Sequence, residues 1–139
     1  MKNLYKSNCM KGMLKPLATL FLFLALITVA NAQVITTNGI KPPAVVSSVG
    51  AFSPGVFIGS NVVITDNGGS TCPNVTYEWQ SASDANFMTN VKEKLASTKD
   101  YNPGAVTTTT YFRRVVTVVC TDPERSLESK TSGVKITIH

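Results

Sequence analysis

The chain has 139 residues, with 13 basic and 8 acidic side chains and a formal net charge of +5. Four of the basic residues lie within positions 1–32, so residues 33–139 carry a net charge of only +1. That length allows one small domain, and that charge excludes the strongly basic surface of a nucleic-acid-binding or anionic-membrane-binding protein.

Residues 1–32 predict a secretory signal peptide. The apolar run Leu17–Val29 lies between a basic N-terminal part and the small-x-small pattern Ala30-Asn31-Ala32, and the basic residues are Lys2, Lys6, Lys11 and Lys15. The alternative is a transmembrane anchor, which needs roughly 20 apolar residues, whereas this run has 13. We therefore expect an exported protein in the cell envelope, at the cell surface or outside the cell, with no transmembrane segment in the mature chain.

Residues 33–54 are rich in Thr, Ser, Val and Pro and show no helical period. We interpret them as an extended leader or linker, part of which could be ordered as a first edge strand. From Gly55 to the end of the chain the pattern is strand-like, which predicts a domain at 55–139. Its first short apolar run, Val62–Ile64, ends at the turn residues 66–69.

Residues 75–81 alternate between apolar and polar side chains, with Val75, Tyr77 and Trp79 on one face. This period of two predicts a half-buried strand with its aromatic residues inward. Residues 81–86 form a polar turn in this interpretation. The stretch 91–97 is locally helix-friendly but too short to be a stable helix, so we expect a single turn or an irregular loop.

Residues 107–120 form the segment richest in β-branched and aromatic residues. If Cys120 points inward, Phe112, Val116 and Val118 point inward too. Arg114 falls on the same face, so we expect it either to reach solvent at one end of the domain or to be shifted by a bulge. A last strand follows at 134–138, and the many short strands predict an antiparallel β-sandwich.

Cys72 and Cys120 are the two cysteines that remain after removal of the signal peptide. An even number of cysteines in an oxidising compartment favours a disulfide, and two buried thiols are the alternative. In the chain-entropy account, such a bridge stabilises the fold by roughly 4 kcal/mol.

Several motifs together resemble an immunoglobulin-like (PKD-like) repeat domain of large secreted bacterial surface proteins and adhesins. They are Pro54-Gly55 with Ile58-Gly59, Tyr77–Ser81, Tyr101–Gly104, and Thr110–Val116 with Cys120. The resemblance covers residues 54–139 and implies an immunoglobulin-like sandwich in a surface setting, without catalytic residues. The chain departs from the family in having one copy. Its tryptophan also follows the first cysteine by only seven residues, closer than in antibody-type domains. This spacing departs from the antibody-type bridge, and a bridge from the entry of the tryptophan strand to the end of the Cys120 strand is still compatible with the resemblance.

The sequence offers no constellation for catalysis, and we expect no enzyme activity, no cofactor and no metal site. The single histidine, His139, is the last residue, too exposed to fraying for a triad or a zinc site. The aspartates lie in turn sequences, where their usual role is to accept backbone hydrogen bonds. A calcium site between these turns is the alternative; the residues are Asp66, Asp84, Asp100 and Asp122.

We expect Trp79 to lie in the core over the disulfide, together with Tyr77, Phe112 and Val116. The alternative makes Trp79 a carbohydrate-stacking platform. Arg113 and Arg114 could bind an anion, although a solvated strand face is the simpler interpretation. The ligand-binding residues are unknown at this point.

The sequence thus predicts a secreted, non-catalytic, adhesion-type binding module whose ligand is a protein or glycan at the cell surface. Binding would use an exposed edge strand or the loops 66–74, 81–87 and 121–131. A structural subunit of an envelope assembly and a carbohydrate-binding accessory module are the alternatives.

Overall fold

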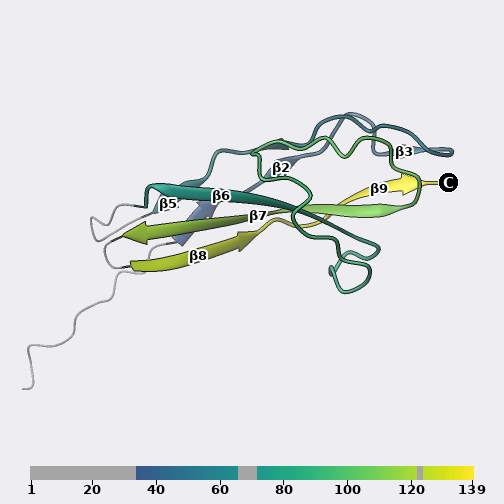
Figure 1. Cartoon of the computed structure of the whole chain (residues 1–139). Helices are drawn as coiled ribbons and strands as arrows, with labels where there is room; N and C mark the ends of the chain where they lie inside the picture. The colour runs from purple at the N-terminus through teal and green to yellow at the C-terminus, as the bar shows by residue number, and fades with distance from the viewer. Residues whose placement is uncertain (1–33, 66–71, 122–123) are drawn as a thin grey trace, which may run out of the picture. The chain divides into compact units, whose positions relative to one another are not determined.

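A computed structural model describes residues 34–65, 72–121 and 124–139, which belong to one compact unit, Asn31–His139. The predicted signal peptide, 1–32, lies outside the described residues. Within them the fold is all-β, without any helix (Figure 1). The strands are β1 (Val34–Thr37), β2 (Ile40–Lys41), β3 (Ser47–Ser48), β4 (Ile58–Gly59), β5 (Val63–Thr65), β6 (Asn74–Ala82), β7 (Thr110–Thr121), β8 (Glu124–Lys130) and β9 (Val134–Ile138).

The main sheet is built around β7. Strand β6 runs antiparallel along one edge of β7 in an unbroken register, from Asn74 opposite Val119 to Ala82 opposite Tyr111. On the other edge of β7, the N-terminal part pairs with β9 and the C-terminal part pairs with β8, both antiparallel. Strand β3 pairs with β9 in parallel. The two longest strands, β6 and β7, thus form the centre of the main sheet, and β7 is rich in β-branched residues.

Strands β8 and β9 form one line along β7, interrupted by a bulge. Lys130 lies opposite Val115 and Val134 opposite Phe112, so residues 131–133 face only Arg113 and Arg114. The Thr131 hydroxyl accepts a hydrogen bond from the Arg114 backbone N–H at 3.0 Å, and the Thr131 N–H donates to the Arg114 carbonyl at 2.9 Å. A side chain therefore replaces the missing backbone acceptor at the bulge.

The second layer is a two-stranded ribbon made of residues 34–41 and 58–65. Strand β1 pairs with β5 and β2 pairs with β4, all antiparallel, and the Ser60 N–H donates to the Gly39 carbonyl at 2.8 Å between the two pairs. The segment 33–54, interpreted as an extended leader, therefore contributes β1 and β2 to this layer and β3 to the main sheet.

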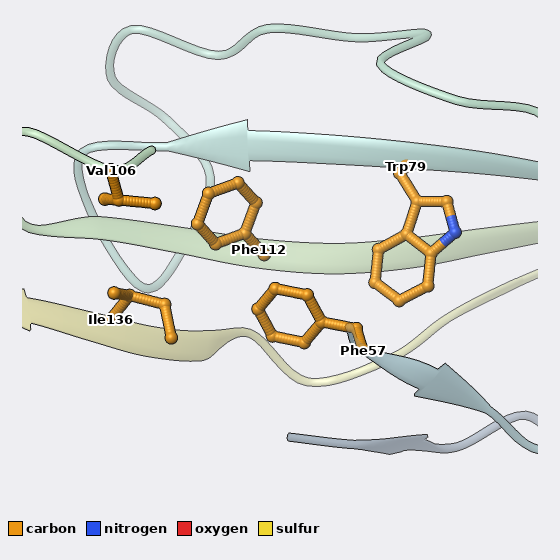
Figure 2. Packing of buried hydrophobic residues seen from close by; sticks show 5 residues of the cluster. All are labelled: Phe57, Trp79, Val106, Phe112 and Ile136. Carbon is orange, nitrogen blue, oxygen red and sulfur yellow. The ribbon is translucent and has the colours of Figure 1, made fainter. Parts of the chain in front are cut away.

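Two hydrophobic clusters lie along the inner face of the main sheet. One contains Trp79, which is 0% exposed, and the other contains Val116, Val118 and Cys120. Figure 2 shows the first cluster, whose buried members are Phe57, Trp79, Val106, Phe112 and Ile136. Trp79 is buried as expected of a core residue, but the expectation that it covers the disulfide is wrong, because Cys120 belongs to the other cluster.

Tyr77 and Tyr101 are both half-buried beside these clusters. The Tyr101 ring stacks on Trp79 with the ring centroids 5.4 Å apart, and the Trp79 indole N–H donates to the Thr98 carbonyl at 2.9 Å. Burial raises the pKa of the Tyr101 phenol. Tyr77 packs against the second cluster.

Arg114 separates the two clusters and is 0% exposed. Its guanidinium donates to the Asn38 side-chain oxygen from Nε (3.1 Å) and Nη2 (2.9 Å), and Nη2 also donates to the Ser60 carbonyl at 3.0 Å. Both explanations that the sequence suggested for Arg114 are wrong, because the side chain reaches no solvent and the β6–β7 register is unshifted. The residue faces the core because the ribbon supplies the oxygen atoms that a buried guanidinium requires.

The surroundings of Arg114 are shaped to hold its charge. Its Nη1 donates to the Lys99 carbonyl at 3.3 Å, and the guanidinium carbon lies 5.3 Å from the centroid of the Tyr77 ring. A Cβ atom at Gly59 would collide with Nη1, so only glycine fits there. Burial lowers the pKa of Arg114, and Tyr77 and Asp100 act in the opposite direction.

The Cys72–Cys120 disulfide is confirmed. Cys72 lies two residues before β6 and Cys120 lies in β7, next to Val119, the partner of Asn74. The bridge therefore fastens two neighbouring strands of one sheet, at the entry to β6 and the end of β7. It does not join the two layers.

We predict that Arg114→Met lowers the free energy of unfolding by about 3 kcal/mol or more, because several buried oxygens lose their donor and each costs about 1–3 kcal/mol. Urea unfolding followed by Trp79 fluorescence measures the loss. The control is Lys130→Met on exposed β8, where we expect a change below about 1 kcal/mol. An Arg114→Met protein as stable as the wild type would contradict this account of the fold.

We predict that the Cys72→Ala/Cys120→Ala variant loses about 4 kcal/mol of unfolding free energy, since it no longer closes the chain across 48 positions. Urea midpoints with and without reductant check this loss. The reduced wild type should match the variant, and the variant should not respond to reductant. A wild type that is insensitive to reductant would contradict the contribution of the bridge.

Candidate functional site

Within the part of the chain that the structure describes, one edge of β6 is only partly paired. Near its C-terminal end, the Trp79 N–H donates to the Ala96 carbonyl and the Leu95 N–H donates to the Trp79 carbonyl, both at 3.0 Å. Ser81 and Lys92 exchange a further pair of backbone hydrogen bonds, at 2.9 and 2.8 Å. The segment 92–96 therefore acts as a short additional strand along this half of β6.

The N-terminal half of the same edge is open. Because backbone groups alternate along a strand, Val75 and Tyr77 direct their N–H and C=O groups to the same edge as Trp79 and Ser81. Within residues 34–65, 72–121 and 124–139, these groups of Val75 and Tyr77 have no hydrogen-bond partner. The open edge thus presents two donors and two acceptors in a row.

A groove of about 430 Å³ runs beside this open edge. We call it the β6-edge groove, and it is lined by Thr76, Tyr77, Glu78, Lys94, Ala96, Ser97 and Thr117. Its side chains include four exposed or half-buried hydroxyl groups, one carboxylate and one ammonium group, and its floor belongs to the β6–β7 pair. Such a surface suits a polar, extended ligand better than an apolar small molecule.

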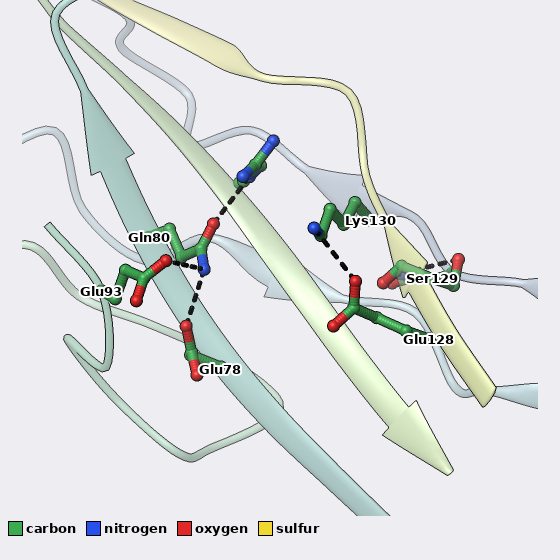
Figure 3. Close-up of polar contacts among 8 residues, drawn as sticks. Glu78, Gln80, Glu93, Glu128, Ser129 and Lys130 are labelled. Atoms are coloured by element: carbon green, nitrogen blue, oxygen red, sulfur yellow. Dashed lines mark hydrogen bonds and ion pairs between the residues drawn. The ribbon is translucent and has the colours of Figure 1, made fainter. Parts of the chain in front are cut away.

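A chain of hydrogen bonds holds the carboxylate of the groove in place (Figure 3). The Gln80 amide nitrogen donates to Glu78 Oε1 at 2.7 Å and approaches Glu93 Oε1 at 3.4 Å. Arg113 Nε donates to the Gln80 side-chain oxygen at 2.8 Å. Gln80 is only 5% exposed, so this chain restricts the rotamers of Glu78 before any ligand arrives.

Arg113 also contacts the loop 83–91. Its guanidinium carbon lies 4.0 Å from the centroid of the Phe87 ring, and Phe87 is 7% exposed although it belongs to a loop. Phe87, Asn90 and Lys94 all have positive φ angles, between 50° and 56°. Non-glycine residues other than asparagine rarely adopt this conformation, so the contacts around Phe87 and Lys94 must hold them there.

Asp84 stabilises the backbone conformation of the loop 83–91. Its carboxylate accepts hydrogen bonds from the backbone N–H groups of Asn86 (2.9 Å), Met88 (3.0 Å) and Thr89 (2.6 Å). Desolvation raises the pKa of Asp84, but the hydrogen bonds together outweigh it and hold the pKa below its ordinary value of 3.8. Asp84 therefore plays the structural role that its turn sequence predicts.

The three predicted binding loops differ in outcome. Residues 66–71 of the first loop lie outside the described residues. The loop at 81–87 is present as a polar turn after β6, whereas the expectation of a loop at 121–131 is wrong, because Glu124–Lys130 forms β8. The β-branched neighbour β7 offers an edge on which even this polar stretch pairs.

The remaining candidate residues are placed as follows. His139 Nε2 lies 2.9 Å from the Ser47 hydroxyl, at the pairing of β3 with β9. In the described part of the chain, no three His, Cys, Asp or Glu side chains are grouped as metal ligands would be, and no helix could span a membrane. Trp79, Phe112 and Val116 are buried, and Arg113 is bonded within the domain.

Sequence reasoning assigned no residue to the groove, and Lys94, Ala96 and Ser97 carry the weakest sequence signal for it. The stretch 91–97 carries a mixed composition without a strand period, so nothing in it indicates pairing with β6. Only the positive φ at Lys94 and the return of the chain to Trp79 bring these side chains beside Thr76 and Glu78.

These features define a disulfide-linked, all-β domain with two layers and a partly open sheet edge. Residues 54–138 match the family described as Domain of unknown function (DUF8696), and the chain belongs to that family. Strands β1, β2 and β3 precede the matched residues. Neither the curated proteins nor the solved structures include a match to the chain.

We predict that Asp84→Asn lowers the melting temperature at about pH 7 and that the difference from wild type shrinks below about pH 4. The folded pKa of Asp84 lies below its unfolded value. The stabilisation of the fold by the ionised Asp84 carboxylate is therefore complete above the pKa of the unfolded state. It is lost as the pH falls through the pKa of the folded state. Thermal unfolding across the acid range tests this, with Glu128→Gln on exposed β8 as the control. A pH-independent difference would contradict the role of the carboxylate.

Proposed function

We propose that the protein is an exported, non-catalytic binding domain with an immunoglobulin-like sandwich fold, which acts in adhesion or recognition at the cell surface. The observation that carries this proposal is the open edge of β6 with the groove beside it. A rigid sheet with an unfilled row of backbone donors and acceptors is a ready binding surface.

The fold supports the immunoglobulin-like part of the proposal. Two β layers enclose a core that contains a buried tryptophan, and the strands of the main sheet are antiparallel except for β3. The motifs around Trp79 and Arg113 that resemble PKD-like repeats form β6 and β7, the centre of that sheet. The disulfide is compatible with passage through an oxidising compartment, which supports export.

Among the alternatives, the structure gives no support to carbohydrate stacking by Trp79. That residue is fully buried, and Tyr101 stacks against it inside the domain. A structural subunit of an envelope assembly is the second candidate, because an open strand edge also serves to join subunits. The two functions differ in whether the partner is a separate ligand or a permanent neighbour.

We predict saturable binding of the fluorescently labelled protein to intact cells or to isolated envelopes of the producing organism. Ser97→Trp places a large ring in the groove and should reduce the affinity at least tenfold. The control is Asn86→Trp, in the exposed loop after β6, which should bind as the wild type does.

Two results would contradict this proposal. One is the absence of saturable binding by a folded wild-type protein. The other is a loss of binding in Asn86→Trp with full binding in Ser97→Trp, which would move the contact to the loop 83–91.

A further inference from the structure

The open edge of β6 also defines the chemical class of its partner, an inference that rests on the proposed binding function. We propose that the partner contributes an extended peptide segment, which adds to residues 74–78 as a further strand. Backbone hydrogen bonds to Val75 and Tyr77 would form the contact, and side chains in the β6-edge groove would select the segment.

The chain itself already uses this edge for strand addition. The segment 92–96 pairs with Trp79 and Ser81 through four backbone hydrogen bonds of 2.8 to 3.0 Å. A peptide beside Val75 and Tyr77 would continue that line of pairing toward the start of β6. The geometry needed for addition is therefore present on the same strand, and the described residues leave its N-terminal half without a pairing segment.

The length of the open edge favours a linear peptide over a folded strand of a second copy. In a symmetric antiparallel pair, Val75 would face Tyr77 of the second copy, and Pro73 would then face Trp79. Leu95 and Ala96 already fill the place beside Trp79. A peptide that ends after five residues avoids this overlap, whereas a second β6 strand continues into it.

The charged side chains that line the groove indicate which side chains the partner peptide should carry. Glu78 and Lys94 both line the groove, and neither has an ion-pair partner among the described residues. Glu78 is held in position through Gln80, with its Oε1 bonded. We therefore expect a cationic side chain next to Glu78, an anionic side chain within reach of Lys94, and a small or hydroxyl-bearing residue against Thr76.

The other sheet edges are less suited to this role. Strand β8 carries charged side chains on its exposed positions and lies beside β1, both of which oppose addition of a further strand. Strand β3 has only two residues, Ser47 and Ser48. Strand β6 combines an open edge, a neighbouring groove and a disulfide that fixes its start.

Linear pentapeptides selected from a phage-displayed random library against the purified protein test this inference. Amide hydrogen exchange with a selected synthetic peptide should slow at least tenfold at Val75 and Tyr77, while the amides of Met88 and Thr89 in the loop stay unchanged. A peptide methylated at the backbone nitrogens that face this edge should bind at least tenfold more weakly than one methylated at the alternate nitrogens.

Protein variants give a second readout. Val75→Pro removes an N–H that points away from β7, a position where an edge strand tolerates proline. It should weaken peptide binding at least tenfold, and Val75→Ala, which keeps the N–H, should retain binding. If Val75→Pro does not fold, the methylated peptides decide the question without any change to the protein.

Three outcomes would overturn the inference. The selected peptides could bind without protecting Val75 and Tyr77. The wild type could form a dimer that protects those amides, which would assign the edge to a second copy. The library could yield no binder while the wild type still binds cells, in which case the proposed binding function stands and only the peptide class is wrong. Loss of cell binding itself would instead contradict the proposed function.

Discussion

The buried guanidinium of Arg114 is the interaction on which the arrangement of the two layers depends. A charged group without solvent must find oxygen atoms at fixed places, and the ribbon provides them at Asn38 and Ser60 while Lys99 provides a third. The ribbon is therefore held against β7 by directional bonds as well as by apolar contact. The glycine at position 59 follows from the same constraint, because any side chain there would occupy the space of the guanidinium.

The pairing of β6 with β7 explains why the candidate site has a fixed shape. Strand β7 anchors β6 through an unbroken register and a disulfide, so the edge of β6 that faces away from β7 is held in place, and among the described residues its N-terminal half has no backbone partner. The hydrogen bonds from Arg113 to Gln80 and from Gln80 to Glu78 also restrict the Glu78 side chain in the groove. A surface with fixed donors and acceptors loses little conformational entropy on binding, which suits recognition of a flexible ligand.

The all-β class and the strands around Trp79 and Phe112 could be predicted from the sequence, because the alternation of apolar and polar residues is a local signal. The disulfide could be predicted because only two cysteines follow the predicted signal peptide. The place of Arg114 could not, since its oxygen partners lie up to 76 positions away at Asn38. Strand β8 has a polar composition, and only its neighbour β7 makes it a strand. The groove depends on the return of 92–96 to β6, a long-range pairing without a periodic signal.

Arg114 also lies between the two hydrophobic clusters, with Phe112 of one cluster before it in β7 and Val116 of the other cluster after it. Small proteins often open in cooperative units with different local free energies. Here the single tryptophan belongs to one unit and the disulfide to the other. An optical signal from Trp79 therefore reports on the cluster that contains it, whereas the start of β6 and the disulfide adjoin the other cluster.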